Sequence, residues 1–384
     1  MNNKIRKICA IITSNIHYAR NKLILREIQK RKNLELQIVV GASAILPAYG
    51  DVLKLMEKDG FKLNAKITMT LEGGNPIAMA KTTGIGITEF ATTFDNLTPD
   101  IVLVRADRYE VLSAAVAAAY LNIPVAHIEG GDVTGTIDES VRHAVTKLSH
   151  IHFATNEESK KRILRMGERP DCVFNVGCPG LEFVAKNNFS ISNELINRVG
   201  VGDLVDINKP FILAMQHPVT TEVGLNRAHI EETLLAVYEL NIPTIWFWPN
   251  IDAGTDELSK GIRVFREKIN PKKIRFIKYL PPESFIALLK GSSCLVGNSS
   301  AGIKECSYLG IPVVNIGTRQ QGRMRGQNVL DVGYNHEEIK RAIQKQMAHG
   351  KYEASGIYYR DNAAKTIVDI LENIGLYTQK RFVD

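Results

Sequence analysis

A strand–helix–strand unit between residues 101 and 127 is the strongest constraint on the fold. The apolar run 101–104 predicts a buried strand, the alanine-rich segment 111–121 predicts a helix, and residues 124–127 predict a second strand. Strands that are joined by such a helical crossover run parallel, and the connection is right-handed. The same alternation recurs along the chain, which indicates an α/β protein with doubly wound parallel sheets.

The alternation of strands and helices restarts after a polar segment at residues 187–206. Before that segment, further strands are predicted at 7–13, 36–40 and 151–155. After it, strands are predicted at 211–215, 244–248, 274–277, 294–296 and 313–316. A chain of 384 residues is long for one hydrophobic core and sufficient for two. We therefore expect two Rossmann-like domains, at residues 1–185 and 186–357, with a cleft between their strand ends.

Composition limits the compartment and the kind of partner. No apolar run approaches the ~20 residues that span a bilayer, and no signal peptide precedes Met1, so we expect a cytoplasmic protein with no membrane partner. The five cysteines are scattered, as in proteins of a reducing compartment. The formal net charge is +7, but the basic residues are spread along helix faces, so nucleic acid is not expected as a partner.

Three acidic side chains are predicted to meet at one edge of the first sheet. Asp107 and Glu129 each follow one strand of the unit described above, and neighbouring parallel strands end at the same edge. Thr136 and Glu139 have the spacing of a capping box, which predicts a helix start and puts Asp138 in the first turn. Ligands bind at this edge in open α/β sheets, so the three acids are candidate functional groups.

Each acid also has a structural explanation when it is taken alone. Asp107 could pair with Arg105 or Arg108, and Asp138 could pair with Arg142 one helical turn later. The convergence of the acids on one edge favours the functional interpretation.

The segment 297–306 predicts an anion site in the second domain. Small residues lie between a strand end and a helix that is expected to continue to about residue 310, and they leave backbone N–H groups free to approach a phosphate. Ser299 and Ser300 can donate hydroxyl groups, and Arg319 could clamp a diphosphate with two N–H groups. A serine-capped tight turn explains the segment equally well.

His217 follows the strand predicted at 211–215 and faces the expected cleft. A lone histidine is more often structural than catalytic, and its position raises the functional odds only modestly. The remaining histidines show no metal-ligand spacing, and the chain offers no nicotinamide site. We therefore expect neither a metal nor another cofactor.

Seven ordered motifs cover nearly the whole chain: Ala106–Glu110, His127–Gly131, Gly135–Ala144, Gln216–Thr221, Pro249–Gly254, Gly297–Ser300 and Gly317–Gln320. With these motifs the chain resembles the hydrolysing UDP-N-acetylglucosamine 2-epimerases, which include bacterial sialic-acid-pathway enzymes and the epimerase half of the mammalian bifunctional epimerase/kinase. The resemblance implies a GT-B fold, a C-terminal helix at about 358–384 that packs back on the first domain, and a homodimer or homotetramer.

The resemblance also implies roles for individual residues. The catalytic positions of the family correspond to Asp107, Glu129, Asp138 and His217. Its nucleotide-binding positions correspond to Ser299, Ser300, Glu305, Arg319 and Asn250, with the serine pair at the diphosphate and Glu305 at the ribose. The chain departs from the family at Ala106, where glycine is usual, and at Asn15 or Ile16, where the family has an arginine.

The implied reaction converts UDP-N-acetylglucosamine and water to N-acetylmannosamine and UDP, for sialic-acid-type sugar synthesis. UDP first leaves C1, a carboxylate removes the acidified C2 hydrogen to give a glycal, and an acid protonates the other face of C2 while water adds at C1. The alternatives are a non-hydrolysing 2-epimerase, a hydrolysing 2-epimerase of 2,4-diacetamido-trideoxy sugar nucleotides in legionaminic acid synthesis, a nucleotide-sugar-binding protein without turnover, and a glycosyltransferase.

Overall fold

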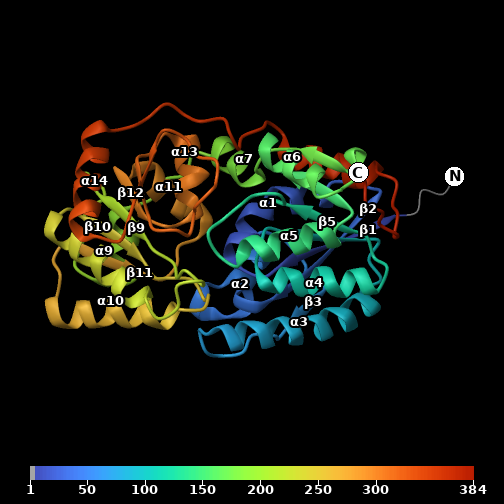
Figure 1. Ribbon diagram of the computed structural model, residues 1–384, viewed down its shortest axis with the longest axis horizontal. Helices are drawn as coiled ribbons and strands as arrows, with labels where there is room; N and C mark the ends of the chain where they lie inside the picture. Colours follow the sequence, from blue (N-terminus) through green and yellow to red (C-terminus); the bar gives the residue numbers. More distant parts are fainter. Residues whose placement is uncertain (1–4) are drawn as a thin grey trace.

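Seven short apolar strands form the first of two sheets. The computed structural model describes residues 5–384, and Figure 1 shows the chain as two domains that lie side by side. Every pairing in the first sheet is parallel, in the order β3-β2-β1-β4-β5-β6-β7. The strands are β1 (Arg6–Ile12), β2 (Leu34–Gly41), β3 (Ala65–Ile67), β4 (Ile101–Arg105), β5 (Val125–Ile128), β6 (Ile151–Ala154) and β7 (Val173–Asn175).

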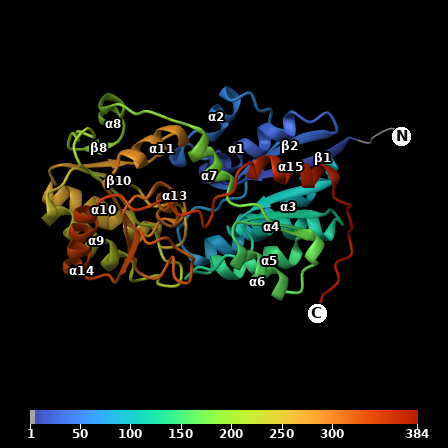
Figure 2. The ribbon, with the colours of Figure 1, turned by 90° about the horizontal axis from the view of Figure 1, so that it is seen from above.

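The strands carry apolar side chains on both faces of this sheet, so helices cover both faces. One apolar cluster joins the sheet to α1 and α15, and a second joins it to α3 and α4. Figures 1 and 2 show the chain returning from the second domain, so that α15 lies beside α1. The helices of this domain are α1 (Asn15–Gln29), α2 (Val52–Lys58), α3 (Pro76–Leu97), α4 (Tyr109–Tyr120), α5 (Asp138–Leu148), α6 (Glu157–Arg165), α7 (Pro179–Lys186) and α15 (Ala363–Asn373).

The second sheet has the order β14-β13-β12-β9-β10-β11-β8 and is parallel except for β8, which pairs antiparallel with β11. Its strands are β8 (Val201–Gly202), β9 (Ile212–Met215), β10 (Thr244–Phe247), β11 (Ile274–Ile277), β12 (Cys294–Gly297), β13 (Val313–Ile316) and β14 (Val329–Val332). The surrounding helices are α8 (Asn193–Arg198), α9 (Asn226–Leu240), α10 (Thr255–Ile269), α11 (Pro282–Gly291), α12 (Ser300–Ile303), α13 (Glu305–Leu309) and α14 (His336–His349).

The predicted fold class, two doubly wound α/β domains of GT-B type, is confirmed. The domain limits remain a prediction, and the first four residues of the first domain lie outside the described part of the chain. Within residues 5–384, no helix combines the length and the apolar character that a bilayer crossing requires.

Two local predictions are wrong in part. The helical segment expected up to about residue 310 ends there, at Leu309, but it is broken at Lys304 into two short helices. The capping box has different partners: Thr136 Oγ1 accepts the N–H of Asp138 at 3.3 Å, and the Glu139 carboxylate accepts the N–H of Thr134 at 2.7 Å. The carboxylate therefore caps the loop before the helix, and α5 begins at Asp138.

Candidate active site

A cavity of about 310 Å³ lies between the two domains. It is bordered by the carboxyl ends of strands in both sheets, the place where ligands bind in open α/β sheets. All nine residues to which the sequence assigns a site role line it, namely Asp107, Glu129, Asp138, His217, Asn250, Ser299, Ser300, Glu305 and Arg319. The structure therefore brings the predicted residues together, and the role of each one remains a prediction.

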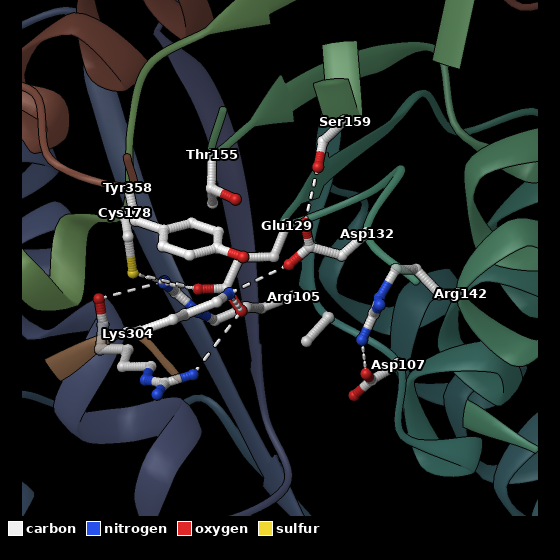
Figure 3. Close-up of polar contacts among 12 residues, drawn as sticks. Arg105, Asp107, Glu129, Asp132, Arg142, Thr155, Ser159, Cys178, Lys304 and Tyr358 are labelled. Atoms are coloured by element: carbon white, nitrogen blue, oxygen red, sulfur yellow. Dashed lines mark hydrogen bonds and ion pairs between the residues drawn. The ribbon is translucent and has the colours of Figure 1, made fainter. Parts of the chain in front are cut away.

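Glu129 follows β5 in a left-handed backbone conformation, with φ of 67°, and is buried. Figure 3 shows the cluster of cations around it: Arg105 Nη2 lies 2.8 Å from Oε1, and Lys304 Nζ lies 3.4 Å from Oε2. Arg20 Nη1 approaches Oε2 to 3.7 Å. Burial alone would raise the pKa of Glu129, but these cations hold the pKa well below its usual range. Glu129 is therefore a fixed anion.

Asp107 follows β4 and points into the cleft. Its carboxylate pairs with Arg142 of α5 (Figure 3). Arg323 Nη2 lies 3.7 Å from the same carboxylate. The preceding residue, Ala106, has φ of 61°, and its carbonyl oxygen accepts a hydrogen bond from His127 Nε2 at 2.8 Å. The buried imidazole therefore stabilises the turn that directs Asp107 toward Arg142.

The structural pairings that the sequence suggested for the acids are wrong. Arg108 does not pair with Asp107; its Nη1 lies 3.1 Å from Oδ1 of Asp252, in the second domain. Arg142 pairs with Asp107 and not with Asp138. Arg105, as described above, pairs with Glu129. Side chains that follow one another along a strand point in different directions, so the partners of these acids come from other elements.

Asp138 is the first residue of α5, and its pKa is shifted in the opposite direction from that of Glu129. Burial raises the pKa of Asp138, and the negative charge of Asp252 raises it further. Arg319 and Arg108 act in the other direction without reversing the shift. The pKa of Asp252 is lowered, because Arg108 and Arg319 outweigh the effect of burial. Asp138 is thus the acid of the cavity best suited to carry a proton.

His217 follows β9 and is oriented by polar contacts of the second domain. Asn298 Oδ1 accepts the N–H of His217 at 2.7 Å, and Asn298 Nδ2 donates to the carbonyl of His217 at 2.9 Å. The backbone N–H of Asn250 donates to His217 Nδ1 at 3.3 Å, so the ring proton is on Nε2. Burial, supported by the charge of Arg319, lowers the pKa of His217 to about 3. The ring is therefore a neutral donor.

The predicted anion site begins at Ser299, which is the N-cap of α12. Ser299 Oγ accepts the N–H of Ala301 at 3.3 Å, and Ser300 is the first helical residue. Arg319 Nη1 donates to the carbonyl of Asn298 at 3.2 Å, which places the guanidinium beside the serine pair. These groups provide hydroxyl and cationic donors on one wall of the cavity.

Glu305 lies deeper, at the start of α13, and is buried. Arg20 donates to Glu305 Oε1 from Nη2 at 2.7 Å and from Nε at 3.2 Å. No donor in the described residues reaches Oε2, which leaves a buried acceptor available to a ligand hydroxyl. Arg20 lies one helical turn after Ile16, so an arginine enters the cleft from the same face of α1. Ile16 itself is 54% exposed at the rim.

Sequence reasoning missed several charged residues of the cavity, among them Arg20, Arg108, Asp252, Lys304 and Arg323. Arg108 and Asp252 lie inside motifs that the resemblance rests on, so the motifs could have indicated them. Arg20 and Lys304 carry no local signal, because their importance comes from contacts between the two domains, Arg20 with Glu305 and Lys304 with Glu129.

The only set of histidine and acidic side chains in residues 5–384 that is close enough to share a metal ion is Glu239, His336 and Glu337. Both glutamates are exposed, and none of the three residues lines the cavity. Exposed acidic clusters are common, and we assign no function to this one.

Two facing parallel-sheet domains with a deep cleft define the protein as a member of the GT-B fold class. The sequence model of the UDP-N-acetylglucosamine 2-epimerase family matches residues 26–372, and the chain belongs to this family. The chain is similar to the hydrolysing UDP-N,N'-diacetylbacillosamine 2-epimerase of Legionella pneumophila, with 34% identity over 98% of both chains. It is 30% identical to the UDP-N-acetylglucosamine 2-epimerase of Neisseria meningitidis over 99% of both chains.

Solved structures show the same fold. The Neisseria meningitidis UDP-GlcNAc 2-epimerase bound to UDP-GlcNAc superposes with a TM-score of 0.77, at 20% identity, over 95% of this chain and 99% of that one. The Methanocaldococcus jannaschii UDP-GlcNAc 2-epimerase in complex with UDP-GlcNAc and UDP gives a TM-score of 0.74, at 21% identity, with the same coverage.

Proposed function

We propose that the protein is a hydrolysing 2-epimerase that converts UDP-N-acetylglucosamine and water to N-acetylmannosamine and UDP. One observation carries the proposal: a single cavity holds Asp107, a carboxylate that is ion-paired with Arg142, and Asp138, an acid whose pKa is raised. Glu129, a fixed anion in the same cavity, stabilises the positive charge that develops at C1. Inversion at C2 needs a base and an acid at the same pH, and environments that separate the pKa values of two acids meet that need.

The first half of the reaction is an elimination. The bond from C1 to the UDP oxygen breaks, and the anionic leaving group is stabilised by Ser299, Ser300 and Arg319 on the wall of the second domain. The positive charge that develops at C1 acidifies the C2 hydrogen. Asp107, which the Arg142 ion pair orients toward the cleft, takes this hydrogen as a proton and the glycal forms.

The second half is a hydration from the other face. Asp138 delivers its proton to C2, and water adds at C1 of the glycal as hydroxide and gives up its other proton to solvent. Neutral His217 can donate from Nε2 to an oxygen of the sugar or the phosphate. Neither half-reaction requires a redox step, because one proton leaves C2 and one returns.

The nucleoside half of the substrate is assigned to the second domain. The free acceptor Oε2 of Glu305 suits a ribose hydroxyl. Beyond it, aromatic and aliphatic side chains suited to a planar base line the cavity, including Phe247, Trp248, Tyr279, Leu280 and Phe285. We also expect a homodimer or homotetramer, as the resemblance implies.

A second candidate function is hydrolysing 2-epimerisation of a UDP-linked 2,4-diacetamido sugar. Two relatives with this type of name, from Legionella pneumophila and Campylobacter jejuni, are 34% and 32% identical to the chain. The resemblance puts Asn15 or Ile16 where the family has an arginine, and the apolar Ile16 at the cavity rim can contact the methyl group of an additional acetamido substituent.

The deciding experiment incubates the protein separately with UDP-N-acetylglucosamine and with UDP-N,N'-diacetylbacillosamine and identifies products by NMR. Free UDP and free N-acetylmannosamine from the first substrate support the main proposal. Turnover of the second substrate alone supports the second candidate. UDP-N-acetylmannosamine at equilibrium with its epimer indicates a non-hydrolysing enzyme, and binding without turnover of either substrate contradicts both proposals.

A further inference from the structure

Lys304 belongs to the second domain, but its ammonium group lies among side chains of the first. It sits at the junction of α12 and α13, and only 1% of its side chain is exposed. Figure 3 shows Nζ between two acids of the loop after β5: it lies 3.4 Å from Oε2 of Glu129 and 3.3 Å from Oδ2 of Asp132. The cation is therefore buried at the domain interface and pairs with two acids of the first domain, of which Glu129 lines the cavity.

The environment of Lys304 is built for a cation. A buried ammonium group is costly unless it is paired and hydrogen-bonded. Asp132 is fixed by hydrogen bonds from Ser159 Oγ at 2.6 Å and Asn156 Nδ2 at 3.3 Å, both from the region of α6. The ring of Tyr358 lies 5.3 Å from Nζ and adds a cation–π contact. These groups hold the ammonium in one position when the domains are together.

Glu129 receives its cations unequally from the two domains. Arg105 and Arg20 both belong to the first domain, although Arg20 also donates to Glu305 of the second. Lys304 is the one cation from the second domain that pairs with Glu129 in the described structure. The charged and titratable groups that face Glu129 from the surrounding elements are Arg20, Arg105, Lys304, Asp132, Cys178, His17 and His127.

The same short segment carries the nucleotide contacts proposed above. Ser299 and Ser300 precede Lys304, and Glu305 follows it directly. We propose that Lys304 is a positioning residue, through which the nucleotide-binding segment fixes the Glu129 carboxylate and its charge when the cleft is closed. This inference rests on the proposed function. Under this proposal, Glu129 is correctly positioned for the reaction only when the segment that holds the nucleotide is in place.

The test compares Lys304→Met with Lys304→Arg. The Met variant keeps most of the volume and removes the charge, and the Arg variant keeps the charge. Lys380→Met is the matched control, because Lys380 is a largely buried lysine 2.6 Å from Glu168 that does not line the cavity. Thermal unfolding, UDP affinity by calorimetry and the pH dependence of kcat are measured for all variants.

In Lys304→Met, kcat should fall by about tenfold or more, while KM and UDP affinity change by less than about threefold. Loss of a neighbouring cation raises the pKa of Glu129, so the acidic limb of the kcat profile should move to higher pH. Lys304→Arg should restore most of the rate. Lys380→Met should lose stability with an unchanged pH profile. A wild-type profile in Lys304→Met, or the same loss in Lys380→Met, would overturn the inference.

Hydrogen exchange gives a readout that does not depend on turnover. The N–H of Gly135 donates to the carbonyl of Arg319 across the domains at 3.2 Å, so its protection in the UDP-bound protein reports closure. Exchange across residues 129–137 should be faster in Lys304→Met than in the wild type or in Lys304→Arg. Equal exchange in all three would contradict the inference. If the wild type turns over neither sugar nucleotide, the proposed function fails. The exchange rates still show whether Lys304 holds the loop at residues 129–137 in place.

Discussion

Arg108 of the first domain and Asp252 of the second form an ion pair across the cleft, with 3.1 Å between Nη1 and Oδ1. Arg108 is anchored on its own side by Glu110, whose two carboxylate oxygens accept from Nε and Nη2 at 3.0 and 2.9 Å. Asp252 is consequently held as an anion near Asp138. The charge of Asp252 in the second domain therefore raises the pKa of Asp138 in the first.

This relationship predicts the pH response of an Asp252→Asn variant. The negative charge of Asp252 raises the pKa of Asp138, so its removal should lower that pKa. If Asp138 donates the proton to C2, less of it is protonated at neutral pH, and the alkaline limb of kcat should move to lower pH. A kcat profile that keeps its alkaline limb would show that Asp138 is not the proton donor.

The two acids with opposite pKa shifts should differ in their effect on stability. Glu129→Gln leaves three cations around a neutral group and should lower the free energy of unfolding at pH 7 by about 3 kcal/mol. The depressed pKa means that the wild-type contribution of Glu129 is present above the unfolded-state pKa and is lost as the pH falls through the folded one. Asp138→Asn removes a charge that folding disfavours, so it should not lower stability at neutral pH.

Chemical denaturation of both variants at pH 7 and at pH 4 checks this contrast. Each variant should also lose roughly two to four orders of magnitude in turnover. Equal destabilisation of the two variants would contradict the electrostatic assignment, and near-normal turnover in either would remove that acid from the mechanism.

The elimination route predicts an isotope pattern. The C2 proton taken by Asp107 exchanges with solvent before the opposite face is protonated. In deuterium oxide the released N-acetylmannosamine should therefore carry one deuterium at C2, as measured by mass spectrometry and NMR. Asp107→Asn should abolish both turnover and exchange. A product with no deuterium at C2 would exclude the elimination.

The serine pair predicts a change in nucleotide affinity. Ser300→Ala should weaken UDP binding by about 1 kcal/mol, since one hydroxyl donor to the diphosphate is lost. Ser300→Asp should weaken it further, because two negative charges would meet. Calorimetry with UDP measures both variants, and Ser140→Ala, an exposed position outside the cavity, is the control. Unchanged affinity in Ser300→Asp would place the phosphates elsewhere.

The strand ends were predictable because period and composition locate short buried strands well. Asp107 and Glu129 follow strands that are parallel neighbours, so topology alone brings them together. The β13 strand has the predicted limits, and α15 lies within the predicted range of about 358–384, since both are strongly patterned. α10 was not predicted, and Gly261 in its interior weakens its local helical signal, although this glycine packs tightly against Ile230 of α9.

Contacts between the domains were not predictable in the same way. Lys304 and Arg20 function through partners more than 100 residues away, and no spacing in the sequence encodes how two domains face each other. The break at Lys304 also escapes prediction, because its sequence surroundings are compatible with one continuous helix. Thr136 and Glu139 have the right spacing for a capping box, but tertiary contacts redirect both side chains.

Gly135 allows a loop of the first domain to contact a loop of the second across the cleft. A Cβ atom at this position would lie 1.9 Å from the carbonyl oxygen of Thr318, so only glycine lets the two loops meet at this distance. In the proposed reaction, this contact holds the loops of the two domains together beside the glycal and UDP. How completely the glycal is hydrated then depends on the rate of hydration compared with the rate at which the two loops separate.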